Sequence, residues 1–421
     1  MYKPSTIVFF VFIASFLAAP LIYTLDKLVL MESSKWVFLA GVIVLPLFGL
    51  LSTLFVQQHE GKNETLYYVW CIFSFTAVVD LFIGLELDGF VKGFMEFYLR
   101  EGEPYLRSSY GTSINWWDGT GHFLMYLGLI YLLVSGRDYR LLCLYWVGSI
   151  THSMIVFMPG NVIGNKGLKW SYFLNVPYVF YPIYAGVRCL RMGMKNRCRM
   201  YPTEKKTWEK IAERLFAVWF LAAIVIASFR FIVMLAVGCK EKITQYYLKE
   251  IEPYLNDPTQ YGRTQALCYF YYFTPVYVAF FCSLIYPGEL WVKDWSLIHA
   301  GASMQAQFVY IWSSLKWRTK PEFQVPDTVE ARCIFWTVNL SLVIVPHLFA
   351  WYCHKSEIRD FFNDCVSPCV SPKLKSFQGE GRTFQKVESI QREIRYIQRT
   401  PEKSEGETPT RRVTRSQKKL K

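Results

Sequence analysis

A four-residue phrase occurs twice in this chain, first as Glu103-Pro104-Tyr105-Leu106 and again as Glu252-Pro253-Tyr254-Leu255. Each copy follows an apolar stretch long enough to cross a bilayer, and each precedes three more such stretches. An asparagine seven residues before a proline also recurs inside apolar stretches, as Asn175 with Pro182 and as Asn339 with Pro346. The two recurrences lie 149 and 164 residues apart, so the chain is a duplicated unit whose copies differ by a loop insertion.

The composition is typical of a membrane protein. Hydrophobic residues make up 52% of the chain and charged residues 19%, below the ~25% of soluble domains. We therefore predict an all-α polytopic membrane protein with about ten transmembrane helices, in which two parallel four-helix repeats follow two N-terminal helices. The predicted spans are 7–25, 36–56, 66–85, 113–134, 140–159, 170–190, 214–236, 265–287, 296–316 and 331–352.

These spans divide the chain into five parts. Both repeats have the same orientation, because each crosses the membrane an even number of times. The parts are 1–60 with two N-terminal transmembrane helices, 62–187 as the first repeat, 188–213 as a basic cytosolic linker, 214–352 as the second repeat and 353–421 as a basic, mostly disordered cytosolic tail.

The formal net charge of +13 does not indicate a nucleic-acid partner, because most of it lies in two segments. Residues 371–421 hold 14 basic and six acidic side chains, and residues 191–214 hold eight and three. Basic clusters beside membrane spans mark the cytosolic side. Four spans separate the two clusters, so we expect both termini in the cytosol. The first span could instead be a cleaved signal, although Pro20 directly after Ala18-Ala19 disfavours cleavage.

The chain ends in Lys418-Lys419-Leu420-Lys421, which places lysines third and fourth from the C-terminus. This resembles the dilysine retrieval signal of endoplasmic-reticulum membrane proteins, although so basic a tail produces two such lysines by chance fairly often. We predict a protein of the endoplasmic-reticulum membrane, with cycling to the ER–Golgi intermediate compartment and coat proteins as partners of the tail.

Two carboxylates lie at bilayer depth in the first repeat, Asp80 and Asp118. A carboxylate there costs at least ~2.5–3.5 kcal/mol, so it marks a functional site by default. His122 follows Asp118 by four residues and shares its helical face. We favour a ligand pocket, while pairing of these groups to fix helix packing remains the alternative. Further pocket residues would be Asn175 in the fourth span and aromatic walls from Trp117 and Tyr178.

The loop after Asp80 also carries carboxylates, which we expect to form a solvated charged loop, with a pocket lid as the alternative. They are Glu86, Asp88, Glu96, Glu101 and Glu103.

The second repeat lacks both intramembrane carboxylates. The spacing from Glu103 to Asp118, applied to Glu252, ends at Leu267, and Arg230 takes the place of Asp80. Acid–base chemistry of the same kind is therefore not possible there. We expect no cofactor and no metal, because metal-ligand spacings and nucleotide-binding loops are absent from the sequence.

A longer stretch resembles the transmembrane 6 superfamily. It runs from Gly93 to Leu106 as Gly-Phe-Met-Glu-Phe-Tyr-Leu-Arg-Glu-Gly-Glu-Pro-Tyr-Leu and continues with Trp117-Asp118-Gly119-Thr120. Members of that family carry two EXPERA domains, the four-helix unit of the sterol double-bond isomerase and of the sigma-2 receptor. The resemblance implies a protein of the endoplasmic reticulum that affects triglyceride secretion, lipid-droplet content and cholesterol handling, with lipoprotein-assembly proteins as possible partners.

The same resemblance suggests roles for the polar residues. Asp118 aligns with the catalytic glutamate of the isomerase, Asn175 with its asparagine, and Asp80 with an acid or histidine of its first helix. Gly84 stands where the isomerase has a second acid, so the proton relay is incomplete. We expect a regulator that binds membrane lipid or sterol in this pocket. The alternatives are an active sterol isomerase that uses Asp80 and Asp118, and a lipid transporter.

Overall fold

The computed structural model describes residues 2–28, 33–57, 59–164, 169–195, 206–236, 241–286, 289, 291–316 and 318–366. All regular elements in these ranges are helical, which confirms the predicted all-α class. Among the described residues, seven helical segments are long and apolar enough to cross a membrane, as expected of a multi-pass protein. The predicted retrieval lysines Lys418 and Lys419, and the predicted disordered tail after Val366, lie outside the described residues.

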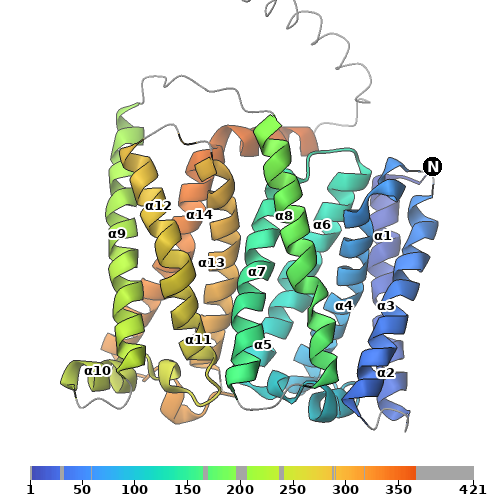
Figure 1. Cartoon of the computed structure of the whole chain (residues 1–421), viewed down its shortest axis with the longest axis horizontal. Helices are drawn as coiled ribbons and strands as arrows, with labels where there is room; N and C mark the ends of the chain where they lie inside the picture. The colour runs from blue at the N-terminus through green and yellow to red at the C-terminus, as the bar shows by residue number, and fades with distance from the viewer. Residues whose placement is uncertain are drawn as a thin grey trace, which may run out of the picture. The chain divides into compact units, whose positions relative to one another are not determined.

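Residues 1–355 form one compact unit, in which the helices run side by side (Figure 1). The N-terminal helices are α1 (Pro4–Ser15), α2 (Ala18–Lys27) and α3 (Ser34–Val56). The first repeat contains α4 (Thr65–Leu87), α5 (Ser109–Trp117), α6 (Phe123–Val134), α7 (Arg140–Ile163) and α8 (Pro177–Lys195). The second repeat contains α9 (Thr207–Leu235), α10 (Lys242–Tyr246), α11 (Tyr261–Cys268), α12 (Thr274–Ile285), α13 (Trp291–Leu315) and α14 (Val329–Val366).

Short helical turns join these helices. In the part of the chain that the structure describes, five are 3₁₀ turns, at Glu60–Asn63, Pro104–Arg107, Trp170–Asn175, Pro253–Asn256 and Pro321–Phe323. Four are π-helical turns, at Tyr98–Gly102, Asp118–His122, Tyr247–Ile251 and Tyr269–Phe273.

The predicted first span, 7–25, is two helices instead of one. The chain leaves α1 after Ser15 and starts α2 at Ala18. Pro20 explains the break, because proline has no N–H to donate to the Phe16 carbonyl and its ring clashes with that group.

The π-helical turns recur in the same places in both repeats. The first of each pair ends directly before Glu103 or Glu252, and the second joins α5 to α6 or α11 to α12. The second pair is offset by 151 residues, from Asp118 to Tyr269, against 149 for the repeated phrase. The position equivalent to Asp118 is therefore Tyr269, and the prediction of Leu267 is wrong because two extra residues precede α11.

The repeats meet where α7 packs along α13 near the centre of the bundle (Figure 1). A Cβ atom on Gly148 would lie 1.7 Å from the carbonyl oxygen of Ile298, and one on Gly301 would lie 1.9 Å from that of Tyr145. Both glycines are thus required for backbone-to-backbone approach. The same two helices share a hydrogen bond of 2.6 Å between His152 Nδ1 and Gln305 Oε1.

Candidate functional site

A cavity of about 190 Å³ lies between the N-terminal helices and the first repeat. Helices α2 and α3 form one wall, and α4, α5, α7 and the start of α8 form the others. Most lining residues are apolar or aromatic, including Leu25, Val44, Phe75, Phe94, Met154 and Phe157. The two N-terminal helices, which the sequence places outside the repeats, are therefore part of the site.

Four carboxylates face this cavity from separate elements. Asp26 comes from α2, Asp80 from α4, Glu103 from the loop before α5, and Asp118 from the π-helical turn after α5. Among the residues that line the cavity, none is Lys, Arg or His. The site is thus a small apolar cavity rich in hydrogen-bond acceptors.

The π-helical turn that carries Asp118 lies directly against α4. A Cβ atom on Gly119 would lie 2.7 Å from the Cα atom of Leu81, so only glycine permits this approach. Leu81 follows Asp80, and the contact therefore brings Asp80 and Asp118 to the same cavity. Asp118 supplies the carboxyl group, and Gly119, which has no side chain, lets the turn approach α4 closely enough to bring that group to the cavity.

Glu103 is the carboxylate that the sequence assigned to a solvated loop, and the structure contradicts that prediction. Its side chain is 4% exposed. It accepts hydrogen bonds from Tyr105 Oη and from Asn175 Nδ2, each at 2.7 Å. Burial raises the pKa of the Glu103 carboxyl, and these donors partly offset the rise. The signal that could have found it is its recurrence as Glu252 in the repeated phrase.

Two other loop acids, Glu86 and Asp88, have partners within the fold, whereas Glu96 is exposed as predicted. Glu86 Oε2 accepts hydrogen bonds from the backbone N–H groups of Phe94 and Met95, at 2.7 and 2.9 Å. Asp88 forms an ion pair with Lys316 of the second repeat. These contacts hold the loop against the bundle, so the loop is folded and only partly solvated.

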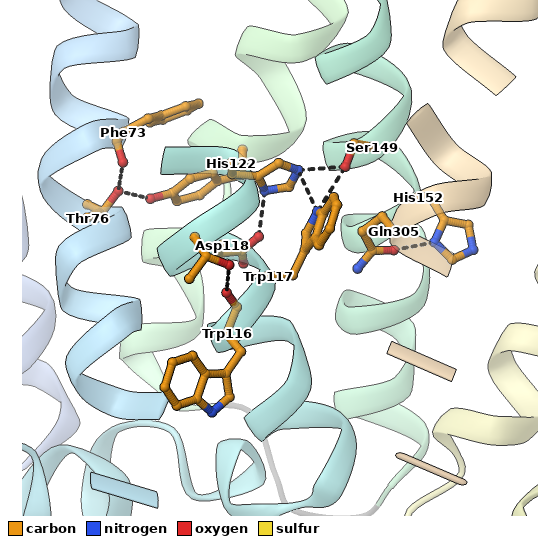
Figure 2. Close-up of polar contacts among 11 residues, drawn as sticks. Phe73, Thr76, Trp116, Trp117, Asp118, His122, Ser149, His152 and Gln305 are labelled. Carbon is orange, nitrogen blue, oxygen red and sulfur yellow. Dashed lines mark hydrogen bonds and ion pairs between the residues drawn. The ribbon is translucent and has the colours of Figure 1, made fainter. Parts of the chain in front are cut away.

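Asp118 begins a chain of hydrogen bonds that runs away from the cavity (Figure 2). Its Oδ1 atom is 2.6 Å from His122 Nδ1, and His122 Nε2 is 2.8 Å from Ser149 Oγ. Trp117 Nε1 donates to Ser149 Oγ at 3.0 Å. The Trp117 indole N–H, which can only donate, also lies 3.2 Å from His122 Nε2, so neutral His122 accepts at Nε2 and carries its proton on Nδ1, towards Asp118.

This order of acid, histidine and serine matches that of a hydrolytic triad, but the serine cannot act as a nucleophile towards the cavity. Ser149 and His122 are fully buried, and neither lines the cavity. The indole of Trp117 occupies the remaining side of the Ser149 hydroxyl. His122, Ser149 and Trp117 therefore orient the Asp118 carboxyl as positioning residues.

The four residues predicted to bind a ligand fall into two groups. Asn175 and Tyr178 line the cavity, whereas His122 and Trp117 lie behind Asp118. The hydroxyl of Tyr178 donates to Thr76 Oγ1, and its ring stacks on Phe73 with 4.3 Å between centroids. Tyr178 is therefore held rigidly against α4.

Asp80 differs from its neighbours. Asp118 pairs with His122 and Asn175 pairs with Glu103. In the described ranges no donor is hydrogen-bonded to the Asp80 carboxyl, which lies at the cavity wall near Asp118 and Glu103. A carboxyl group at bilayer depth without a partner is available to a ligand.

The described residues contain no group of three or more His, Cys, Asp or Glu side chains that could hold a metal ion.

Comparisons with known proteins find a matching family and several similar proteins. Residues 17–200 match the family described as "Transmembrane 6 superfamily member 2-like, transmembrane domain". The mouse protein Transmembrane 6 superfamily member 2 is 37% identical over 346 residues, which cover 80% of this chain and 90% of that protein. The human protein of the same name is 33% identical, over 80% and 90%. No solved structure matches the chain.

Proposed function

The chain belongs to the transmembrane 6 superfamily, and from that premise we propose that it regulates lipid metabolism in the endoplasmic-reticulum membrane by binding a sterol or other lipid in the cavity of its first repeat. Its effects would be on triglyceride secretion, lipid-droplet content and cholesterol handling. The observation that carries the proposal is the partnerless carboxyl of Asp80 at the wall of an apolar cavity. Burying such a group is costly unless something hydrogen-bonds to it.

The cavity suits a lipid whose polar end donates hydrogen bonds. Asp80, Glu103 and Asp118 can accept from a hydroxyl, and the apolar walls fit the adjoining hydrocarbon. A sterol hydroxyl has this chemistry.

The size of the cavity favours binding over catalysis. About 190 Å³ is below the ~300–1,000 Å³ of pockets that enclose a drug-sized ligand. The cavity therefore holds the polar end of a sterol and the adjoining ring, while the rest lies outside it. An isomerase would need the double bond of the ring system between its acid and its base.

The alternative function is a sterol double-bond isomerase. One observation favours it: Asp80 and Asp118 face the same cavity, and only Asp118 is hydrogen-bonded to a histidine. Asp80 would donate the proton and Asp118 would remove one. This reading requires α2 and α3 to move apart so that the ring system can enter.

One experiment separates the two functions. The full chain in lipid nanodiscs is incubated in heavy water with a sterol that has its double bond in the B/C-ring position, beside Asp118→Asn and the exposed control Asp327→Asn. Bound but unchanged sterol is the expected result. A shifted double bond with deuterium gained by wild type and Asp327→Asn alone would establish the isomerase. Absence of binding in all three would overturn both functions and favour a role through lipoprotein-assembly proteins.

The proposed location rests on the tail and on the helix directions. The C-terminal end of α8 and the N-terminal end of α9 lie at the same end of the bundle as the N-terminal end of α1 (Figure 1), which supports placing the N-terminus and the basic linker together in the cytosol. Lys418 and Lys419 would then bind coat proteins. Replacing both by serine should move the protein from the endoplasmic reticulum to later compartments, as seen by fluorescence microscopy. Unchanged location would contradict the retrieval signal.

A further inference from the structure

The second repeat shows which kind of group fits beside the glutamate and the asparagine that both repeats share. Glu103 and Asn175 line the cavity of the first repeat, and their equivalents are Glu252 and Asn339. In the second repeat the guanidinium of Arg230 forms an ion pair with Glu252 and donates to Asn339 Oδ1 at 2.9 Å. A cation of the protein therefore occupies the place that corresponds to the cavity.

Two aromatic residues complete the surroundings of this guanidinium, and both have counterparts at the cavity. Arg230 Nε donates to the hydroxyl of Tyr247 at 3.5 Å, and Arg230 Cζ lies 5.4 Å from the centre of the Tyr310 ring. Tyr98 precedes Tyr247 by the 149 residues that also separate the two glutamates, and it lines the cavity. Phe157 precedes Tyr310 by 153 residues and lines the cavity as well.

The offset of 153 residues is the one that relates α7 to α13. The two close approaches between these helices, of Gly148 to Ile298 and of Gly301 to Tyr145, are exchanged by the same offset. The two aromatic residues are thus equivalent. The first repeat therefore keeps all four groups that surround the cation in the second: a glutamate, an asparagine, a tyrosine and a further aromatic ring.

What the first repeat lacks is the cation. Asp80 stands in the place of Arg230, and Asp118 brings one more carboxyl group to the cavity. Among the lining residues none is Lys, Arg or His. A buried carboxylate without a cation is strongly unfavourable, so these acids favour a ligand with a positive charge. A hydroxyl donates one hydrogen bond and is neutral, whereas a primary ammonium donates three and is charged.

We propose that the cavity of the first repeat binds a lipid whose polar end is a protonated primary amine. The ammonium lies between Asp80 and Glu103, where the second repeat has its guanidinium, and the ring of Phe157 faces the cation. The apolar walls contact the first carbons of the hydrocarbon chain. This inference rests on the proposed function, because it names the class of lipid that the same cavity takes.

The test uses the full chain in phosphatidylcholine nanodiscs at neutral pH. Octadecylamine and octadecanol that carry the same diazirine are compared, and mass spectrometry locates the labelled residues. We expect the amine to label the cavity residues Val44, Phe94 and Met154 about tenfold more strongly, because a hydrogen bond to a charged group is worth at least the ~1.4 kcal/mol of a tenfold preference. Labelling at Leu348, which is exposed on α14, corrects for the amount of each probe in the bilayer.

A photoreactive sterol in parallel separates failure of this inference from failure of the proposed function. Equal or weaker labelling of the cavity by the amine, or labelling by the sterol alone, would overturn the inference and leave the proposed function standing. If none of the three probes labels the cavity, both are wrong.

Two substitutions assign the preference to the cavity. Asp80→Asn replaces one carboxyl oxygen by an NH₂ group and should lower the preference for the amine severalfold. Phe157→Leu keeps an apolar wall and removes the ring, so it should weaken labelling by the amine and not by the alcohol. Glu96→Gln is the matched control, because Glu96 lies in the same loop as Glu103, is exposed and does not line the cavity. A preference unchanged by Asp80→Asn, or lost equally in Glu96→Gln, would contradict the proposal.

Asp80→Arg gives the first repeat the cation of the second. The arginine should pair with Glu103 and Asn175 as Arg230 does with their equivalents, so we expect the cavity to lose labelling by the amine while labelling at Leu348 stays. Undiminished labelling by the amine in the folded variant would overturn the proposal. Size-exclusion profiles show which variants are folded, and Asp80→Asn decides the question if Asp80→Arg does not fold.

Discussion

Both repeats place a glutamate beside an asparagine. In the first repeat this pair lines a cavity, whereas in the second repeat an arginine is bonded to both residues. Asn175 Nδ2 donates to Glu103 at 2.7 Å, and Asn339 Nδ2 lies 3.4 Å from Glu252. Where the first repeat has the partnerless Asp80, the second has Arg230, which forms an ion pair with Glu252.

Arg230 is held from several sides. It donates to Asn339 Oδ1 at 2.9 Å, and its guanidinium lies 5.4 Å from the centre of the Tyr310 ring. Tyr310 also donates to Glu252, at 3.2 Å. The side chains of Arg230 and Glu252 are 4% and 1% exposed. In the second repeat the buried polar side chains are thus bonded to one another, whereas in the first repeat Asp80 has no hydrogen-bond donor among the described residues.

The position of Asp118 shows the same contrast. Its equivalent, Tyr269, is buried, and the Tyr269 hydroxyl accepts a hydrogen bond from Gln307 Nε2 at 2.5 Å. A small charged residue faces a cavity in one repeat, and a large neutral one packs into the core in the other. The comparison teaches that one four-helix scaffold can form a ligand site or a structural core, depending on a few residues in the same places.

The largest expected effect on stability comes from removing the buried arginine of the second repeat. Arg230→Ala leaves Glu252 buried without its cation, so we expect the free energy of unfolding to fall by ~3–5 kcal/mol. Asp80→Ala should cost far less or stabilise the protein, because it removes a carboxyl without a partner. Thermal unfolding in detergent measures both. Equal destabilisation by the two substitutions would contradict the conclusion that the buried charge is paired in the second repeat and unpaired in the first.

The junction of the repeats should be equally sensitive from both sides. Gly148→Ala and Gly301→Ala each force a Cβ against a carbonyl oxygen, and we expect losses of ~1–3 kcal/mol. Gly128→Ala is the control, because its Cβ would meet only the flexible end of Leu142, at 3.1 Å. A tolerated change on one side alone would mean that the two repeats do not contribute alike to the junction.

Ligand binding should depend on the first repeat alone. Asp80→Asn keeps the shape of the side chain and replaces one carboxyl oxygen by an NH₂ group, so we expect sterol affinity to fall about tenfold, close to the ~1.5 kcal/mol upper end for one hydrogen bond. Glu252→Gln should leave affinity unchanged while it lowers stability. Titration with a fluorescent sterol in nanodiscs checks this, and loss of affinity in Glu252→Gln would place the ligand elsewhere.

The smallest effect concerns the cavity wall. Tyr178→Phe removes the hydrogen bond to Thr76 and keeps the stacking on Phe73, so we expect a loss of ~0.5–1.5 kcal/mol. Thermal unfolding detects such a change. A much larger loss would show that Tyr178 has a further partner, such as a bound lipid.

Much of the candidate site could be predicted from the sequence. Asp80 and Asp118 stand out because charge at bilayer depth is rare, and the structure brings both to one cavity. Glu103 was misassigned because a loop carboxylate is ordinarily solvated, and only its repetition as Glu252 hinted at more. The α2 and α3 wall was missed because nothing local relates those helices to Asp80.

The register of the second repeat shows where spacing alone fails. The repeated phrase and the second π-helical turns have offsets of 149 and 151 residues, so counting from Glu252 gave Leu267 and not Tyr269. Because two residues are added before α11, the later positions of the second repeat no longer match the first at an offset of 149. Counting residues from Glu252 cannot detect this addition.

The sequence by itself determined the all-α membrane class, the duplication and the presence of acids at bilayer depth, because hydropathy, short phrases and composition are local properties of a chain. Only the tertiary structure decided which acids share a cavity, which are neutralised and where the repeats touch. Those outcomes depend on contacts between distant segments, such as Gly119 against Leu81 and Arg230 against Glu252. Such contacts form when helices pack, and packing is a property of the whole bundle.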